Sequence, residues 1–254
     1  MNGPKLLTAF LAAATVLFCA AAPTFSGGKG AHWSYGGKDG PAHWGDLSGA
    51  YEVCKTGHQQ SPINIGRVQQ TGLAALETSY LSTPLRIINN GHTIQVDYAP
   101  GSTMELGGSA FDLLQFHFHS PSENTVAGKH FDMEVHFVHK NGAGQLGVLG
   151  VFIKSGAANA ALAKIWAHLP RAANSAAAPA GKTVNGSALL PASKAYYRFV
   201  GSLTTPPCSE GVQWHVAKQP ITASPQQISE FVKLIGTNNR PVQDFNSRLL
   251  MLSE

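Results

Sequence analysis

Two short segments carry histidines at a spacing that favours metal binding. LLQFHFH at 113–119 contains His117 and His119 one residue apart, and FDMEVHFVH at 131–139 contains His136. Alternate residues of a β-strand point to the same face, so the first two histidines lie about 6.5 Å apart at the backbone. If the two segments pair in one sheet, three imidazoles converge on one cation. Three neutral nitrogens suit Zn²⁺ and leave its fourth position open, as in a catalytic zinc site.

Polar residues stand two positions before two of these histidines. Gln115 precedes His117 and Glu134 precedes His136, each on the same predicted strand face. A histidine that binds a metal usually donates its second ring N–H to a polar partner. We therefore predict that Gln115 and Glu134 support the zinc ligands. A single strand histidine is more often an ordinary hydrogen-bonded residue, so the prediction depends on all three histidines meeting.

The rest of the chain predicts one β-dominated domain with a few peripheral helices. Runs rich in β-branched and aromatic residues indicate strands. They lie at 85–88, 93–98, 113–119, 131–139, 146–153, 196–202 and 212–216, with hairpin-type turns at 89–91 and 141–144. The Ala-rich stretch 172–180 is expected to be an exposed connection.

Helical periodicity occurs in two places. Leu162, Ile165, Trp166 and Leu169 follow one helical face that ends before Pro170. The second helix is predicted within 224–236. Ser224 is its expected cap, Pro225 fits its first turn, and Gly236 ends it. Its predicted apolar stripe is Ile228, Phe231, Val232 and Ile235.

The N-terminus predicts export from the cytoplasm. Lys5 precedes an apolar run that ends in the small residues Ala20 to Ala22, which is typical of a secretory signal. We expect residues 1–22 to be a cleaved signal peptide and residues 23–254 to form the mature domain, periplasmic or secreted, without a stable membrane span. A retained anchor is the alternative. The formal charge of +4 is scattered and forms no basic stripe, which argues against nucleic acid as a partner.

Two cysteines remain after removal of such a signal. Cys54 and Cys208 are an even number in a chain bound for an oxidising compartment, which favours a disulfide between them. The alternative is two buried free thiols.

An ordered series of motifs spans about His32 to Arg248. It comprises HWSYGG, QQSPINI, INNGH, QFHFHSPSENT, MEVHFVH, LGVLGVF, GSLTTPPCSEGVQW and NNRPVQ. In this order the chain resembles an α-class carbonic anhydrase of the secreted bacterial type. The resemblance implies a large mixed, mostly antiparallel central sheet. It also implies reversible hydration of carbon dioxide to bicarbonate and a proton, by attack of a zinc-bound hydroxide. A homodimer is compatible with it, because dimers occur in this family.

The resemblance assigns further roles. His117, His119 and His136 match the Zn²⁺ ligands, Cys54 and Cys208 the family's disulfide, and Thr204 with Glu123 the pair that orients the hydroxide. The implied proton shuttle is His92, with a water path along Tyr35, Asn90 and Gln95. The implied substrate-binding residues are Val138, Val148, Leu203, Thr205, Val212 and Trp214. Two positions depart from the pattern: Asn124 replaces a histidine of many relatives, and Gln95 replaces an asparagine.

Two other classes of protein fit part of the pattern. His117, His119 and Glu123 also read as H-x-H-x-x-x-E, the ligand pattern of cupin-type oxygenases and isomerases that bind iron or manganese. The glycines and the second motif of that class are missing from the sequence. A non-catalytic zinc carrier or adhesion domain on the same scaffold is the second alternative, and zinc binding without hydration activity would identify it.

Overall fold

The structure, a computed structural model, describes residues 30–253. The predicted signal peptide at 1–22 lies outside the described residues. Within residues 30–253, no helix has both the length and the apolar character needed to cross a membrane.

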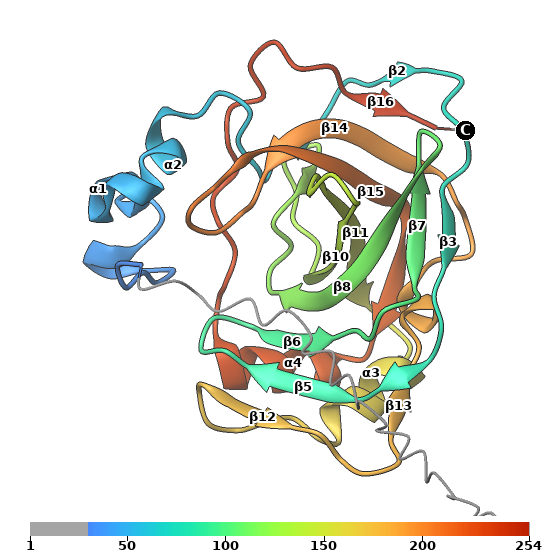
Figure 1. The fold of residues 1–254 in the computed structure, drawn as a ribbon. Coiled ribbons are helices and arrows are strands. Elements are labelled where there is room, and N and C mark those ends of the chain that lie inside the picture. The colour runs from blue at the N-terminus through green and yellow to red at the C-terminus, as the bar shows by residue number, and fades with distance from the viewer. Residues whose placement is uncertain (1–29, 254) are drawn as a thin grey trace, which may run out of the picture. The chain divides into compact units, whose positions relative to one another are not determined.

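One sheet of 12 strands organises the described chain (Figure 1). Its main path runs in the order β12, β5, β6, β8, β10, β11, β15, β14, β16 and β2, and β7 joins β3 to β8. Neighbours are antiparallel except β11 with β15 and β16 with β2. The expected large, mixed and mostly antiparallel sheet is therefore confirmed.

The strands of this sheet have the following bounds: β2 Gln69–Gln70, β3 Glu77–Ser79, β5 Arg86–Asn89, β6 Ile94–Asp97, β7 Thr103–Leu106, β8 Ser109–His119, β10 Met133–Lys140, β11 Leu146–Ser155, β12 Ser175–Ala177, β14 Tyr196–Ser202, β15 Glu210–Ala223 and β16 Met251–Leu252. Two small pairs stand apart, β1 (Asn64–Ile65) with β9 (Thr125–Val126) and β4 (Thr83–Pro84) with β13 (Thr183–Val184). All seven predicted strands are present. The two turns join β5 to β6 and β10 to β11 as expected.

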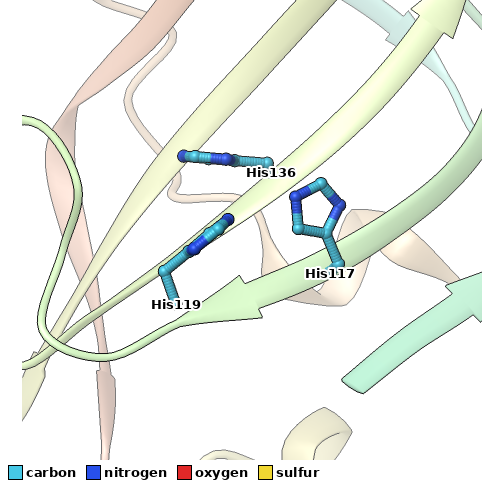
Figure 2. A group of neighbouring side chains, drawn as sticks. All are labelled: His117, His119 and His136. Atoms are coloured by element: carbon cyan, nitrogen blue, oxygen red, sulfur yellow. The ribbon is translucent and has the colours of Figure 1, made fainter. Parts of the chain in front are cut away.

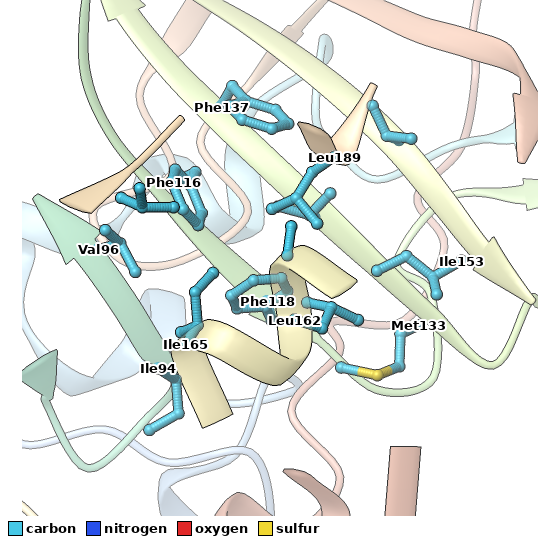
Figure 3. Packing of buried hydrophobic residues seen from close by; sticks show 14 of the residues in the cluster. Ile94, Val96, Phe116, Phe118, Met133, Phe137, Ile153, Leu162, Ile165 and Leu189 are labelled. Atoms are coloured by element: carbon cyan, nitrogen blue, oxygen red, sulfur yellow. The ribbon is translucent and has the colours of Figure 1, made fainter. Parts of the chain in front are cut away.

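Side chains that alternate along the central strands build a separate apolar cluster on each face of the sheet. On one face Phe116, Phe118 and Phe137 pack in the larger core with helix α3, Ala160–Trp166 (Figure 3). The Phe118 and Trp166 rings lie 4.9 Å apart, and Trp166 stacks at 6.2 Å on Phe231 of helix α4, Pro225–Ile235. The opposite face carries a smaller cluster around Trp214 and Val148. We call this second face the site face and the first the back face.

Both predicted helices exist, with differences in detail. Helix α3 ends at Trp166, before Leu169, although Leu169 is buried as predicted. In α4, Ser224 and Gln227 form a capping box and Gly236 adopts a φ of 83°. The predicted apolar stripe of α4 is wrong in part, because Phe231 is buried while Val232 is 39% exposed. Only part of that stripe reaches the core beside α3.

The segment before β1 folds as short helical turns: η1 Gly37–Asp39, α1 Trp44–Leu47, η2 Gly49–Tyr51 and α2 Val53–Thr56, with η3 Gly186–Leu189 later in the chain. Trp44 and Tyr51 pack there with a disulfide between Cys54 and Cys208, whose sulfurs are 2.05 Å apart. The disulfide prediction is confirmed and the free-thiol alternative is wrong.

The Ala-rich stretch 172–180 is more than an exposed connection. Ser175–Ala177 form β12, which pairs antiparallel with β5 at the edge of the large sheet. Small side chains without a strong strand propensity hid this pairing, which the neighbouring strand determines.

Candidate metal centre

The three histidines predicted as metal ligands converge at one point of the site face. His136 on β10 stands directly opposite His117 on β8, and His119 follows two residues later on the same face. Figure 2 shows the three rings pointing toward one another from the two strands. One nitrogen from each ring lies within 4.8 Å of the others. This spacing suits a cation held between three imidazoles.

Each ring has a polar group close to its other nitrogen. His117 Nδ1 is 2.8 Å from Gln115 Oε1, and His119 Nδ1 is 2.8 Å from the carbonyl oxygen of Asn238. His136 Nε2 lies 3.2 Å from Glu134 Oε1, a close contact without hydrogen-bond geometry. These contacts leave Nε2 of His117 and His119, and Nδ1 of His136, for the common point. The structure therefore brings Gln115 and Glu134 to the positions predicted for them.

The Glu134 carboxylate is itself held from several sides. Its Oε2 accepts the main-chain N–H groups of Glu123 and Asn124, both at 2.9 Å, and its Oε1 accepts Asn124 Nδ2 at 2.8 Å. Asn124, the departure from the family pattern, thus retains the supporting hydrogen bond. Gly150 stands opposite His136 on β11, where a Cβ atom would lie 2.8 Å from Glu134 Oε1. Only glycine leaves room there for the carboxylate.

Glu123 lies beside the histidines but outside the ligand group. Its Oε2 is 3.6 Å from His119 Nε2 and 3.8 Å from His136 Nδ1, while its Oε1 accepts the main-chain N–H of Arg240 at 2.9 Å. Burial raises the pKa of Glu123 to about 8, against the lowering effects of the Arg240 amide and the Thr204 hydroxyl. The Thr204 hydroxyl thus lies near the Glu123 carboxylate.

Burial sets the protonation of the whole centre. It lowers the pKa of His119 to about 4 and takes the pKa values of His117 and His136 well below their ordinary value. Neutral imidazole is the form that binds a metal. Burial also raises the pKa of Glu134 to about 7, and a divalent cation at the centre would lower it again.

An apolar wall adjoins the histidines. Val138, Val148 and Trp214 form a row across β10, β11 and β15, and the Trp214 ring lies 4.9 Å from that of His136. Val212 and Leu203 belong to the same cluster, so five of the six predicted substrate-binding residues share one apolar cluster. Thr205 is half-buried, and its carbonyl accepts the N–H of Cys208.

The residues predicted for proton transfer do not converge on one point as the three histidines do. His92 is half-buried after β5, and its ring stacks on Trp33 with 3.8 Å between the centroids. Burial, and then the nearby His32, lower the pKa of His92. Gln95 stands opposite His117 across the β6–β8 pair, but its amide donates to Asp97 Oδ1 at 2.7 Å.

The other two members of that path differ in their surroundings. Asn90 uses its side-chain oxygen to accept the main-chain N–H groups of His92 and Thr93, both at 2.9 Å. The Tyr35 ring lies 6.5 Å from that of His92, and its pKa is raised by burial and by Glu123.

Comparison with known proteins agrees with this geometry. Residues 39–254 match the family model described as eukaryotic-type carbonic anhydrase. A carbonic anhydrase of Pectobacterium carotovorum is 48% identical over 221 residues, which cover 87% of this chain and 90% of the relative. The chain belongs to the α-carbonic anhydrase family.

Solved structures of this α-carbonic anhydrase fold share the same architecture. The Thermovibrio ammonificans α-carbonic anhydrase, solved with the inhibitor sulfanilamide, superposes with a TM-score of 0.85 at 46% identity, covering 87% of this chain and 99% of its own. Dioscorin, solved with ascorbate, superposes with a TM-score of 0.82 at 30% identity, covering 87% of this chain and 97% of its own. The cupin alternative is wrong, because both the fold and the family are different.

Two residues of the site escaped prediction. Asn238 accepts from His119 through its carbonyl, and Arg240 donates to Glu123 through its amide. Both lie in the NNRPVQ motif, and membership of that motif is the only sequence signal that could have pointed to them. Main-chain groups are common to all residue types, so no side-chain pattern reveals them.

Proposed function

We propose that this protein is a zinc-dependent carbonic anhydrase that converts carbon dioxide and water reversibly to bicarbonate and a proton. The observation that carries the proposal is the meeting of three imidazoles, with nitrogens within 4.8 Å, beside the apolar row of Val138, Val148 and Trp214. The site thus offers a cation-binding centre next to a surface for a small nonpolar molecule.

The donor set fits Zn²⁺. His117, His119 and His136 would hold the ion, and the buried His119 Nε2 has no hydrogen-bond partner that would compete for it. Bound zinc is a Lewis acid that brings the pKa of a water ligand to about 7, an effect for which carbonic anhydrases are themselves the reference case. The polar groups beside the other nitrogen of each ring would then keep the three zinc-binding nitrogens oriented toward the ion.

Thr204 and Glu123 orient the attacking oxygen in this proposal. The Glu123 carboxylate would accept a hydrogen bond from the Thr204 hydroxyl, which leaves the Thr204 oxygen free to accept another. An acceptor held in place there would bind the O–H of the attacking oxygen and so orient its lone pair toward carbon dioxide. Carbon dioxide rests against the apolar wall of Val138, Val148, Leu203, Val212 and Trp214, with Thr205 as the sixth proposed substrate-binding residue.

Each turnover releases a proton, which His92 passes to buffer. Burial and the nearby His32 lower the pKa of His92 below the ordinary value near 6.5, which keeps its ring neutral and able to accept that proton at neutral pH. Stacking on Trp33 fixes the ring at 3.8 Å, and Asn90 holds the turn that carries it. Tyr35, Asn90 and Gln95 line the water path between the centre and His92.

We further propose that residues 1–22 are a cleaved signal peptide and that residues 23–254 work in the periplasm or outside the cell. The Cys54–Cys208 disulfide supports an oxidising compartment. Mass spectrometry of the exported protein would locate the new N-terminus, and light scattering would test for a homodimer.

The function is tested by stopped-flow hydration of carbon dioxide, before and after zinc is stripped and restored. We expect activity to vanish with the metal and to return with it. Full zinc occupancy without hydration would refute the proposal and identify a binding protein on this scaffold.

A further inference from the structure

The side chain of Arg240 is buried away from the histidines and has no part in the proposed chemistry. It is 1% exposed. Its Nη1 donates to Gln60 Oε1 and to the Ser61 carbonyl, both at 2.8 Å, and its Nη2 donates to the Cys54 carbonyl at 2.9 Å. The guanidinium also lies 5.6 Å from the centre of the Trp44 ring. Burial of a charged group costs free energy that its hydrogen bonds only partly offset, so the burial of this guanidinium calls for an explanation.

The main chain of the same residue reaches the site. The Arg240 N–H holds Glu123 Oε1 at 2.9 Å, and this leaves Glu123 Oε2 facing His119 Nε2 and His136 Nδ1 at 3.6 and 3.8 Å. One carboxylate oxygen is thus fixed by residue 240, and the other faces the metal centre. A shift of the 240 peptide would rotate the carboxylate.

The partners of the guanidinium lead back to the other half of the Glu123 pair. Gln60 Nε2 donates to the Cys208 carbonyl at 3.0 Å, and the Cys208 N–H donates to the Thr205 carbonyl at 2.9 Å. Thr205 follows Thr204 directly. Arg240 therefore connects the segment before β1 and the disulfide with both Glu123 and the Thr204 turn.

We propose that the Arg240 guanidinium is a positioning group for Glu123. It anchors the 240 peptide so that its N–H holds the carboxylate in the orientation that Thr204 needs. This inference rests on the proposed pairing of Thr204 with Glu123. The alternative is a purely structural arginine, which would affect stability without affecting the site.

The chain offers a matched control for this test. Arg248 donates to the carbonyls of Phe245, Val200 and Asp244 and lies 5.0 Å from the Phe245 ring centre. Its main-chain N–H points to the Phe245 carbonyl and not to the site. Arg248→Lys therefore makes the same chemical change in a half-buried network that does not reach Glu123.

The test uses isothermal titration calorimetry to measure the affinity of the zinc-loaded protein for two ligands. A sulfanilamide that binds zinc through its deprotonated nitrogen would keep one N–H, which would donate to the Thr204 oxygen, whereas thiocyanate has no hydrogen to donate. In Arg240→Lys we expect sulfanilamide affinity to fall about tenfold and thiocyanate affinity to change less than about twofold. Arg248→Lys should leave both affinities, and their ratio, unchanged.

Two more variants complete the test. Gln60→Leu removes one partner of the guanidinium and should shift the ratio in the same direction by a smaller factor, which gives an answer even if Arg240→Lys fails to fold. In a Glu123→Gln background, Arg240→Lys should change the ratio by less than about twofold, because the two act through one contact. An equal loss of both ligands, or a full effect in that background, would overturn the inference. A selectivity shift in a protein that never hydrates carbon dioxide would refute the proposed function alone.

Discussion

The two faces of the central strands both bury histidines, and they use them differently. On the site face, His117, His119 and His136 turn one nitrogen each to a shared point. On the back face, His139 Nε2 is 2.8 Å from the Tyr80 hydroxyl, and His215 packs against the Tyr196 ring at 5.1 Å. Burial lowers the histidine pKa on both faces. A buried histidine alone therefore does not identify a metal site; nitrogens that converge, each ring held by a second contact, do.

The largest expected effect separates the faces directly. His119→Ala removes one of three donors, and we expect zinc affinity to fall by more than about a thousandfold, because each ligand supplies several kcal/mol of binding. His139→Ala should keep zinc affinity and lower the free energy of unfolding by about 2–3 kcal/mol through a cavity and an unpaired Tyr80. Chelator competition and urea unfolding measure the two quantities. Loss of zinc from the His139 variant would contradict the assignment of metal binding to the site face alone.

Thr204→Ala tests the site face without touching a ligand. We expect zinc to stay bound and turnover to fall about 100- to 1,000-fold, as when one oriented hydrogen-bonding group is removed from an active site. Stopped-flow hydration with metal analysis gives both values. Thr78→Ala on β3 is the control and should retain full turnover. Normal turnover in the Thr204 variant would remove the residue from the mechanism.

His92 is half-buried in the turn between β5 and β6, so solvent reaches it and its effect should depend on the buffer. His92→Ala should slow turnover about a hundredfold in dilute buffer, the lower range for loss of a general acid–base group. Added imidazole should restore the rate, because it carries the proton instead. A variant as fast as the parent in dilute buffer would exclude His92 as the shuttle.

Gln115→Ala tests the support of the ligands. Loss of the acceptor for His117 Nδ1 should weaken zinc binding about 10- to 100-fold. Gln213 lies between Val212 and Trp214 and points to the back face, so Gln213→Ala is the matched control and should leave zinc affinity unchanged. Equal zinc affinity in both variants would mean that His117 needs no such partner.

The smallest expected effect concerns the back face and pH. Burial lowers the pKa of His139 and His215 to about 3, while the unfolded chain has values near 6.5. The unfolded state therefore binds more protons below pH 6.5. Stability is unaffected above that pH and falls by about 1.4 kcal/mol per pH unit for each histidine as the pH drops toward 3. Unfolding of zinc-stripped protein at pH 7 and pH 5 should show a smaller loss in His139→Gln/His215→Gln. Equal losses would contradict this account.

The sequence predicted best where strand alternation alone decides the geometry. His117, His119 and Gln115 share a face because they lie two residues apart, and pairing of β8 with β10 then brings in His136. Both ends of helix α4 could be predicted, because the Ser224 cap and the positive φ of Gly236 depend only on neighbouring residues.

The remainder depends on contacts between distant segments. Val232 has the helical spacing of a core residue but faces solvent, because tertiary packing decides which turn is covered. The strand at 175–177 exists because β5 offers it an edge. Asn238 and Arg240 act through main-chain groups in a segment without periodicity, so only the folded chain reveals their contacts.

The closeness of β8 and β10 along the chain also bears on the order of assembly. All three proposed zinc ligands lie within 117–136, whereas Thr204 and Trp214 come from a much later stretch that joins the sheet through the parallel pairing of β11 with β15. Short loops close at a lower entropic cost than long ones, so local pairs form first. We therefore expect a folding chain to bring the three histidines together before Thr204 and Trp214 join them. Pulse-labelled hydrogen exchange should show β8 and β10 protected ahead of β15, and the reverse order would refute it.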